Sequence, residues 1–221
     1  RAWRAQWVED MIADIPELDG ERIHPLQLAL DVQGAMSDGD WLVIDGGNTH
    51  FWSEIAVNIA GFQGKKLGGI LHPGTFSLLG VGVSFAVSAK NVDPSRNVVL
   101  ISGDGAFLSG GLSIEAAFQE NRPIVVVIDN NGGLDCISQQ QERLFASGTH
   151  YATDFRDIPF HAMFEGLGGH GELVTRREDI IPAVQRAIAS GKTACVNVKV
   201  KGVISPIVLA TTSKRDKASI E

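Results

Sequence analysis

The sequence predicts an α/β fold, a three-layer sandwich in which helices cover both faces of a central, mainly parallel sheet. Two solid apolar runs, at 97–102 and 124–129, are typical of strands that are buried on both faces. Helical stretches alternate with these runs, and such alternation produces a parallel sheet between two layers of helices. Functional residues of such sheets lie at the carboxyl ends of the strands.

The chain opens with two predicted helices. Residues 1–20 place Trp3, Trp7 and Met11 at a spacing of four, which puts them on one face of a helix. A second helix is predicted over 25–36, directly before the first strand.

The next predicted elements are a short strand at 41–44 and a glycine turn at 45–48. The stretch 67–89 that follows is uncharged and as long as a membrane span. Because a His-Pro-Gly sequence at 72–74 interrupts its first half, we reject a membrane span and expect no membrane partner. A buried core helix is predicted over 76–89 instead.

The second half of the chain repeats the alternation of strands and helices. An apolar segment follows the last predicted strand and ends in a charged terminus, so 201–221 is interpreted as a tail and a candidate active-site flap. The other predicted elements are, in order, a strand at 97–102, a helix at 113–119, a strand at 124–129, a helix at 180–190 and a strand at 193–200.

Composition excludes several classes of function. The 221 residues are 44% hydrophobic and 20% charged, which is typical of a soluble domain large enough to bury one core. The net charge of −7, without a long run of Lys or Arg, argues against nucleic acid as a partner. Cys136 and Cys195 match no metal or redox spacing, so we expect free thiols and a cytoplasmic location. The chain begins at Arg1 without a signal peptide, which favours a fragment of a longer protein.

Three glycine-rich turns follow predicted strands, at 46–50, 103–105 and 129–133. Each turn alone is typical of any tight connection. Together they predict a ligand site at one edge of the sheet. The dinucleotide fingerprint is incomplete, because Phe85 and Leu108 stand where its third glycine belongs, and this argues against a nicotinamide-dependent oxidoreductase.

Asp104 lies inside the second turn, where its carboxylate would repel a phosphate group bound by the backbone N–H groups of that turn. A bridging Mg²⁺ removes this repulsion, and Mg²⁺ prefers oxygen ligands. Asp104, the side-chain oxygen of Asn131 and a backbone carbonyl of the turn at 132–133 offer three such oxygens from two neighbouring strand ends.

A two-part sequence motif, at 103–105 and 130–131, resembles that of a known enzyme family. Gly103, Asp104 and Gly105, followed after 24 residues by Asn130 and Asn131, resemble the thiamine-diphosphate motif of the acetolactate synthase, 2-hydroxyacyl-CoA lyase and 2-oxoacid decarboxylase superfamily. The segments 45–49, 74–82 and 166–171 are similar to further parts of the same domain in that family.

The similarity covers about 22–200 and corresponds to the carboxyl-terminal, diphosphate-binding domain of such enzymes. It implies a division of the chain into three parts. These are a linker helix at 1–20, a domain at 21–200 that binds thiamine diphosphate and Mg²⁺, and the tail at 201–221.

The resemblance also implies which residues hold the cofactor and its metal. Asp104 and Asn131 would bind Mg²⁺ together with the carbonyl oxygen of Gly133. The diphosphate would be held by Asn48, by Thr49 and by the turn that starts at Gly103, through the N–H groups of Gly105 and Ala106.

Further positions match residues that surround the rings of the cofactor. Leu79 matches the bulky residue that wedges between the two rings, and the carbonyl oxygen of Ser77 would accept a hydrogen bond from the aminopyrimidine. Cys136 and Ile137 would face the thiazolium ring. Ile137 is aliphatic where some members carry a catalytic glutamate, so no general acid is expected from this position. Contacts with the substrate are expected from His50, His72 and Gln140.

The function that the resemblance implies is a lyase or transferase that makes or cleaves a carbon–carbon bond adjacent to a carbonyl, with a 2-oxoacid or a 2-hydroxyacyl-CoA as substrate. The family's active site also needs a glutamate from a pyrimidine-binding domain. This chain lacks that domain, so another segment or subunit of a homo- or hetero-oligomer must supply it, and the chain alone is expected to be inactive. The alternative is a non-catalytic cofactor-binding or regulatory subunit.

Overall fold

The structure is a computed structural model, and it describes residues 6, 22–145 and 147–213. The linker helix predicted over 1–20 therefore lies outside the described residues, apart from residue 6. The tail is described as far as residue 213. Within these ranges no helix is long and apolar enough to cross a membrane.

The described residues form a six-stranded sheet with the spatial order β2-β1-β3-β4-β6-β5. Every neighbouring pair runs parallel, which confirms the predicted fold class. The chain passes from β1 outward to β2 and then returns to β3 on the other side of β1. Such a switch point opens a crevice at the carboxyl ends of the two strands. The strands are β1 (Trp41–Asp45), β2 (Gly69–Leu71), β3 (Val98–Gly103), β4 (Val125–Asn130), β5 (His170–Val174) and β6 (Ala194–Lys199).

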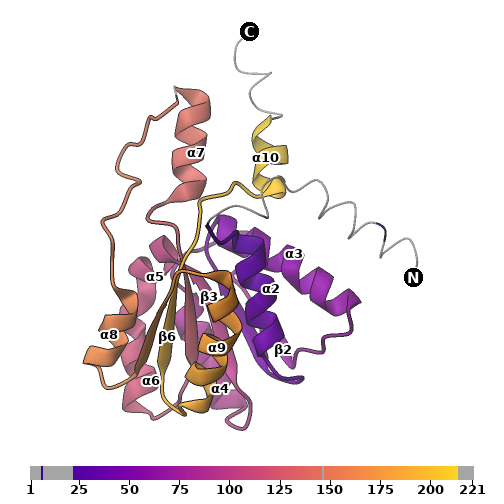
Figure 1. Cartoon of the computed structure of the whole chain (residues 1–221), viewed down its shortest axis with the longest axis vertical. Helices are drawn as coiled ribbons and strands as arrows, with labels where there is room; N and C mark the ends of the chain where they lie inside the picture. Colours follow the sequence, from indigo (N-terminus) through magenta and orange to yellow (C-terminus); the bar gives the residue numbers. More distant parts are fainter. Residues whose placement is uncertain (1–5, 7–21, 146, 214–221) are drawn as a thin grey trace.

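Helices cover both sides of the sheet, as Figure 1 shows. Successive residues of the strands point to opposite faces, so Ile101 belongs to one apolar core and Leu100 to the other. The first core is closed by α2 (Pro25–Ala35), α3 (Asn48–Phe62) and α9 (Ile180–Ala189). The second is closed by α4 (Gly82–Val92), α5 (Asp104–Gly110), α6 (Glu115–Gln119) and α8 (Phe160–Gly166), with the short turn η2 (Gly111–Ile114).

Two helices stand apart from the layers. α7 (Asp135–Leu144) and α10 (Pro206–Ser213) project beyond the sheet at the top of Figure 1. α7 starts a few residues after the carboxyl end of β4, so this is the edge of the sheet at which a ligand is expected.

The start of α2 illustrates how local sequence determines an element. Pro25 occupies its first position, where a missing N–H costs nothing. The ring nitrogen Nδ1 of His24 accepts a hydrogen bond from the N–H of Leu26 at 3.0 Å, and Gln27 Oε1 accepts one from the N–H of His24 at 3.1 Å. Two N–H groups of the first turn are therefore satisfied by a reciprocal cap.

The helix predicted over 76–89 is wrong in its first part. The chain forms a 3₁₀ turn, η1 (Gly74–Phe76), and α4 begins only at Gly82. Gly80 has a φ of 88°, in the left-handed region that favours glycine. The buried carboxylate of Asp45 accepts hydrogen bonds from the N–H groups of Gly80 at 3.0 Å and Gly82 at 2.7 Å, so these groups are not available to a helix.

Several elements were missed by the sequence analysis. α3 follows the predicted glycine turn directly, although its apolar residues Trp52, Ile55 and Ile59 recur at helical spacing. β2, β5, α7 and α8 were not predicted either. β5 has the sequence HGELV, and an edge strand with a glycine and a glutamate carries little strand signal. The remaining 3₁₀ turn is η3 (Arg177–Asp179).

The described part of the tail packs against α3 at its amino-terminal end. The indole N–H of Trp52 donates to the carbonyl oxygen of Val203 at 2.9 Å, and the N–H of Ser205 donates to Asn48 Oδ1 at 3.1 Å. Ser205 and Val208 are buried. The tail therefore lies beside the carboxyl ends of the strands, and its role as a flap stays a prediction.

Trp52→Phe should loosen the tail, because it removes the N–H donor to Val203 and keeps most of the buried ring. We expect a loss of about 1–2 kcal/mol in the free energy of unfolding and faster amide hydrogen exchange across 201–205. Trp41→Phe is the matched control, since its indole N–H contacts Asp93 at 3.4 Å and not the tail. Equal exchange of the tail in both variants would rule out this contact as its anchor.

Candidate functional site

A cavity of about 330 Å³ lies at the carboxyl ends of β1, β3 and β4. It brings together all the site residues predicted from the sequence except His72 and Gln140, which do not line it. The predicted site residues that line the cavity are Asn48, Thr49, His50, Ser77, Leu79, Gly103, Asp104, Gly105, Ala106, Asn131, Gly133, Cys136 and Ile137. Residues 166–171 lie elsewhere, at the amino-terminal end of β5.

Asp104 lies at the base of the cavity, at the start of α5, with only 2% of its surface exposed. Its Oδ1 accepts a hydrogen bond from the N–H of Gly105 at 2.7 Å. Its Oδ2 accepts hydrogen bonds from Gly132 at 2.8 Å and Gly133 at 3.2 Å. Burial nevertheless raises the pKa of Asp104 to about 6, because the charged form loses more solvation than the three donors return.

The turn after β4 is held in place by the loop that crosses it. Asn131 Oδ1 accepts a hydrogen bond from the N–H of Gly133 at 3.1 Å. Gly133 pairs with Asp154 in an antiparallel bridge, and a Cβ at this position would lie 2.6 Å from the carbonyl oxygen of Thr153. The close approach therefore requires glycine. The oxygens of Asp104 and Asn131 thus lie on two neighbouring turns with a fixed backbone.

The side chains of Asn48 and Thr49 are already engaged inside the protein. The amide of Asn48 donates to Gln139 Oε1 at 3.1 Å and accepts from Ser205. Thr49 Oγ1 donates to Asp129 Oδ2 at 2.8 Å. The backbone N–H groups at the start of α3 are further donors for an anion, because its N-cap residue Gly47 provides no side-chain cap.

Asp129 was missed as a site residue, since it appeared only as part of a turn. It is 2% exposed, and its Oδ1 has no hydrogen-bond partner among the described residues. Burial, together with the neighbouring charge of Asp104, raises its pKa to about 7, although the hydrogen bond from Thr49 opposes this shift. Two buried carboxyl groups therefore interact here: that of Asp104, which lines the cavity, and that of Asp129, which does not line it.

The acidic side chains of the cavity wall are Asp104 and Asp135. Among residues 22–145 and 147–213, no Lys or Arg lines it. Burial raises the pKa of Asp135, whose Oδ2 accepts a hydrogen bond from Gln139 at 2.9 Å. An anionic ligand can enter such a site only together with a cation that binds the carboxylates.

The opposite wall is apolar and comes from the segment that Asp45 holds. Ser77 has a φ of 47°, and Ser77 and Leu79 both line the cavity. Leu79 is 39% exposed, and its neighbours Phe76 and Leu78 are 93% and 61% exposed. Leu79 therefore reaches the cavity from a short non-helical segment between η1 and α4.

The first turn of α7 forms the third side. Cys136 and Ile137 line the cavity, and burial raises the pKa of the Cys136 thiol. Gln140 turns back along its own helix, where its Nε2 donates to the carbonyl oxygen of Cys136 at 3.0 Å. His50 lines the cavity, and its Nε2 forms a hydrogen bond with Glu54. His72 does not line the cavity, but its ring packs against the ring of His50.

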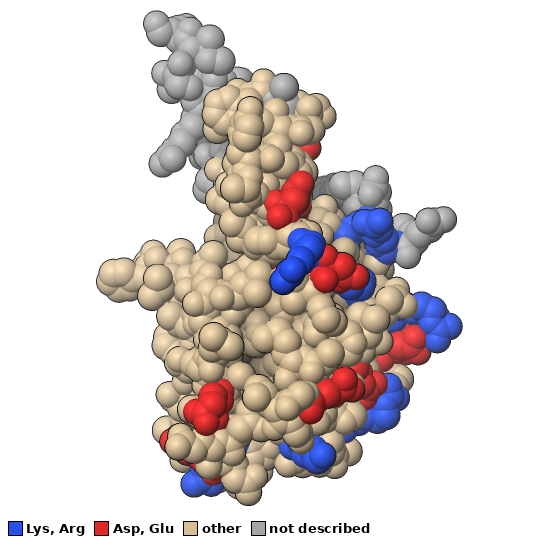
Figure 2. Space-filling model, turned by 90° about the vertical axis from the view of Figure 1, so that its left-hand side faces the viewer, with Lys and Arg blue, Asp and Glu red and all other residues tan. Residues whose placement is uncertain are grey.

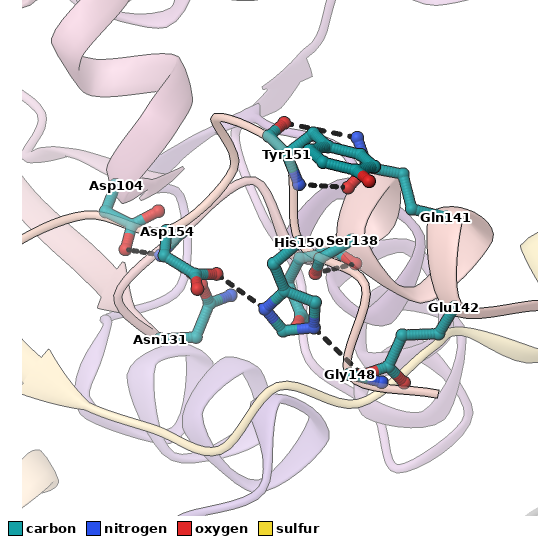
Figure 3. A network of polar contacts seen from close by, with 11 residues as sticks. Asp104, Asn131, Ser138, Gln141, Glu142, Gly148, His150, Tyr151 and Asp154 are labelled. Carbon is teal, nitrogen blue, oxygen red and sulfur yellow. Dashed lines mark hydrogen bonds and ion pairs between the residues drawn. The ribbon is translucent and has the colours of Figure 1, made fainter. Parts of the chain in front are cut away.

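A polar network connects α7 to the loop that supports the turn after β4 (Figure 3). The ring of His150 lies between Glu142, at 2.9 Å, and Asp154, at 2.8 Å. Gln141 exchanges two hydrogen bonds with the backbone of Tyr151. Because Asp154 pairs with Gly133, this network links the exposed end of α7 to the turn beside Asp104.

The His150 contacts should depend on pH. Hydrogen bonds to Glu142 and Asp154 raise the pKa of His150 above its ordinary value of 6.5. A raised folded-state pKa means that the stabilisation is complete below about pH 6.5 and is lost as the pH rises through the folded value. An NMR titration of the ring should show this raised pKa, and Glu142→Gln should lower it. An unchanged pKa in Glu142→Gln would show that Glu142 does not hold the ring.

Comparisons with known proteins found similarities along most of the chain. The family model described as thiamine pyrophosphate enzyme, C-terminal TPP binding domain, matches residues 45–198. A probable acetolactate synthase of Mycobacterium bovis is 34% identical over 208 residues, covering 87% of this chain and 36% of that protein. A 2-hydroxyacyl-CoA lyase 2 of Danio rerio is 28% identical over 193 residues, covering 84% of this chain and 30% of that protein.

A solved structure agrees with these relatives. The thiamine diphosphate-dependent 4-hydroxybenzoylformate decarboxylase of Rhodococcus jostii has a TM-score of 0.66 and 26% identity, covering 84% of this chain and 34% of that one. The chain thus spans about a third of the length of the relatives it matches.

Proposed function

Because this chain belongs to the thiamine pyrophosphate enzymes, as their carboxyl-terminal TPP binding domain, we propose that its cavity binds thiamine diphosphate through Mg²⁺. We further propose that the complete enzyme makes or cleaves a carbon–carbon bond adjacent to a carbonyl. The acetolactate synthase and the 2-hydroxyacyl-CoA lyase among its relatives support this reaction class.

The observation that carries the proposal is the charge of the cavity wall. Carboxylates line it, and no Lys or Arg does so in the part of the chain that the structure describes, so a diphosphate needs a divalent cation between itself and Asp104. The donor set fits Mg²⁺, because Asp104, the amide oxygen of Asn131 and the carbonyl of Gly133 are hard oxygen ligands on two adjacent turns. To bind the metal, Asp104 must exchange one or more of its backbone donors for the ion.

The other lining residues would bind and orient the cofactor. When bound, thiamine diphosphate supplies a nucleophilic carbon that adds to a substrate carbonyl. Leu79 would separate its two rings, and the carbonyl oxygen of Ser77 would accept a hydrogen bond from the pyrimidine ring. Cys136 and Ile137 would exclude water on the side of α7. The N–H groups of Ala106 and at the start of α3 would hold the diphosphate, together with the N–H of Gly105 and the side chains of Asn48 and Thr49 if these three release their internal partners.

A pyrimidine-binding domain or subunit is proposed to cover the cavity mouth. Large exposed apolar side chains lie on two segments that contribute to the cavity, 76–79 and α7, and on the loop after α7. Monomeric proteins rarely expose large apolar patches to water. Figure 2 shows that the end of the molecule projecting beyond the sheet carries few charged side chains on the side viewed. The exposed residues are Phe76, Leu78, Leu79, Ile137, Leu144, Phe145 and Tyr151. The partner would complete the active site within a homo- or hetero-oligomer, in the cytoplasm, where the free thiols Cys136 and Cys195 stay reduced.

The substrate is proposed to be a 2-oxoacid or a 2-hydroxyacyl-CoA. Of the three expected substrate contacts, His50 is supported by its place in the cavity wall, and His72 and Gln140 lie outside that wall. The test is a substrate screen on the complete protein with thiamine diphosphate and Mg²⁺, with release of CO₂ or acyl-CoA as the signal. Turnover of either class supports the proposal. Cofactor binding without turnover of any member of either class would favour a non-catalytic subunit.

A further inference from the structure

A second cluster of metal-ligating side chains lies beside the cavity. Among the described residues, the ligand atoms of His50, Glu54 and His72 all lie within 4.8 Å of one another. His50 and Glu54 come from successive turns of α3, and His72 comes from the segment after β2. None of the three belongs to the proposed Mg²⁺ site of Asp104 and Asn131.

The distances suit a small cation. His50 Nε2 lies 2.9 Å and His72 Nδ1 lies 4.0 Å from the same carboxylate oxygen, Glu54 Oε1. Zinc binds histidine nitrogen and carboxylate oxygen at about 2.0–2.2 Å, so two ligands of a tetrahedral ion lie about 3.3 Å apart. The observed separations bracket that value. Movements of about an ångström in Glu54 and His72, which are 37% and 38% exposed, would close the site.

The two imidazoles present their nitrogen atoms differently. His50 Nε2 donates to Glu54 Oε1, so it must lose this proton, which the neutral ring can carry on Nδ1, before Nε2 binds a metal. The N–H of Gly74 donates to His72 Nδ1 at 3.2 Å, which places the lone pair on this nitrogen. That contact is exposed, so water can replace His72 as the partner of Gly74 when a metal takes the lone pair. The ring of His50 meets the ring of His72 edge to face, with centroids 5.0 Å apart, and both lie beside the same carboxylate.

From this geometry we propose that His50, Glu54 and His72 bind a divalent transition-metal ion of the Zn²⁺ class. Two imidazoles and one carboxylate favour zinc over Mg²⁺, which prefers oxygen ligands alone. Three protein ligands leave one position of a tetrahedral zinc ion open. Since His50 also lines the cavity, the ion lies at the rim of the proposed cofactor site and does not depend on bound cofactor.

The test is calorimetric titration of Zn²⁺ into the complete protein, without thiamine diphosphate and with excess Mg²⁺ to fill oxygen sites. We expect one Zn²⁺ per chain. His72→Asn and Glu54→Gln should each weaken binding by about tenfold or more. Co²⁺ in place of Zn²⁺ should give the strong visible absorption of a tetrahedral site, and His72→Asn should remove it.

Two control variants locate the ion. His170→Asn is a matched control, since His170 also bonds a glutamate, Glu172, at 2.7 Å. It should leave Zn²⁺ affinity unchanged, because no third ligand completes a metal-binding group there among the described residues. Asp104→Ala should also keep Zn²⁺ binding. The proposal is overturned if Zn²⁺ does not bind stoichiometrically, if His72→Asn binds it as tightly as the unmodified protein, or if Asp104→Ala abolishes binding.

Discussion

Replacing Asp104 by alanine is expected to abolish Mg²⁺-dependent binding of thiamine diphosphate to the complete protein. The substitution removes the buried carboxylate that the ion would bind, and Asp135 is the one other carboxylate that lines the cavity among the described residues. Leaving the charges of a buried ion pair unmatched costs about 3–5 kcal/mol, which corresponds to a loss of at least about a hundredfold in affinity. Isothermal titration calorimetry in the presence of Mg²⁺ measures this loss.

The control for this experiment is Asp157→Ala. Asp157 is an exposed carboxylate that pairs with Lys199 outside the cavity, and its loss should leave cofactor affinity unchanged. Asp104→Ala should remain folded, because the substitution also relieves a carboxyl group whose pKa is raised by burial. Unchanged affinity in a folded Asp104→Ala protein would remove Asp104 from the metal site.

Asp45→Ala is expected to have the second largest effect, on both stability and cofactor binding. Asp45 is 1% exposed, and its carboxyl group accepts hydrogen bonds from the N–H groups of Gly80 and Gly82. Alanine leaves both donors without a partner, and a buried unsatisfied donor costs about 1–3 kcal/mol. Since burial raises the pKa of Asp45, removing the charge returns part of this cost. We expect a net loss of about 2–4 kcal/mol.

Asp45 acts through the segment that carries Ser77 and Leu79, so it is a positioning residue. Asp45→Asn is the matched variant, because Oδ2 accepts both hydrogen bonds and an amide oxygen in its place can still accept them, which should keep most of the stability. Urea unfolding measures the stability difference, and amide exchange at 77–82 reports whether the segment has loosened. Normal exchange and normal cofactor affinity in Asp45→Ala would show that the segment holds its shape without Asp45.

The sequence predicted where the site lies more reliably than the path of the chain through it. Apolar strands and glycine turns are local signals, and parallel strands place their carboxyl ends at one edge, so Asp104 and Asn131 were predicted to meet. The path of 77–81 was not predictable, because it depends on Asp45, which is more than thirty residues away in the sequence. An uncharged run ending in a helix favours a longer helix when this distant acceptor is unknown.

The hydrogen-bond partners of the site's side chains could not be predicted from the sequence either. Asn48 bonds Gln139 and Ser205, which come from α7 and the tail. Thr49 bonds Asp129, a residue that looked like part of a turn. The pairing of His72 with the His50 and Glu54 pair likewise arises from tertiary structure, since β2 lies next to β1. In the sequence, only His50 and Glu54 show a helical i,i+4 spacing, and His72 lies apart from them.

Binding of an anionic cofactor through a divalent cation is tested most directly by calorimetric titration of thiamine diphosphate into the complete, unmodified protein, once with Mg²⁺ and once with EDTA. We expect stoichiometric binding with Mg²⁺ and a loss of about tenfold or more in affinity without it. Equal affinity in EDTA, or no binding in either buffer, would contradict this expectation.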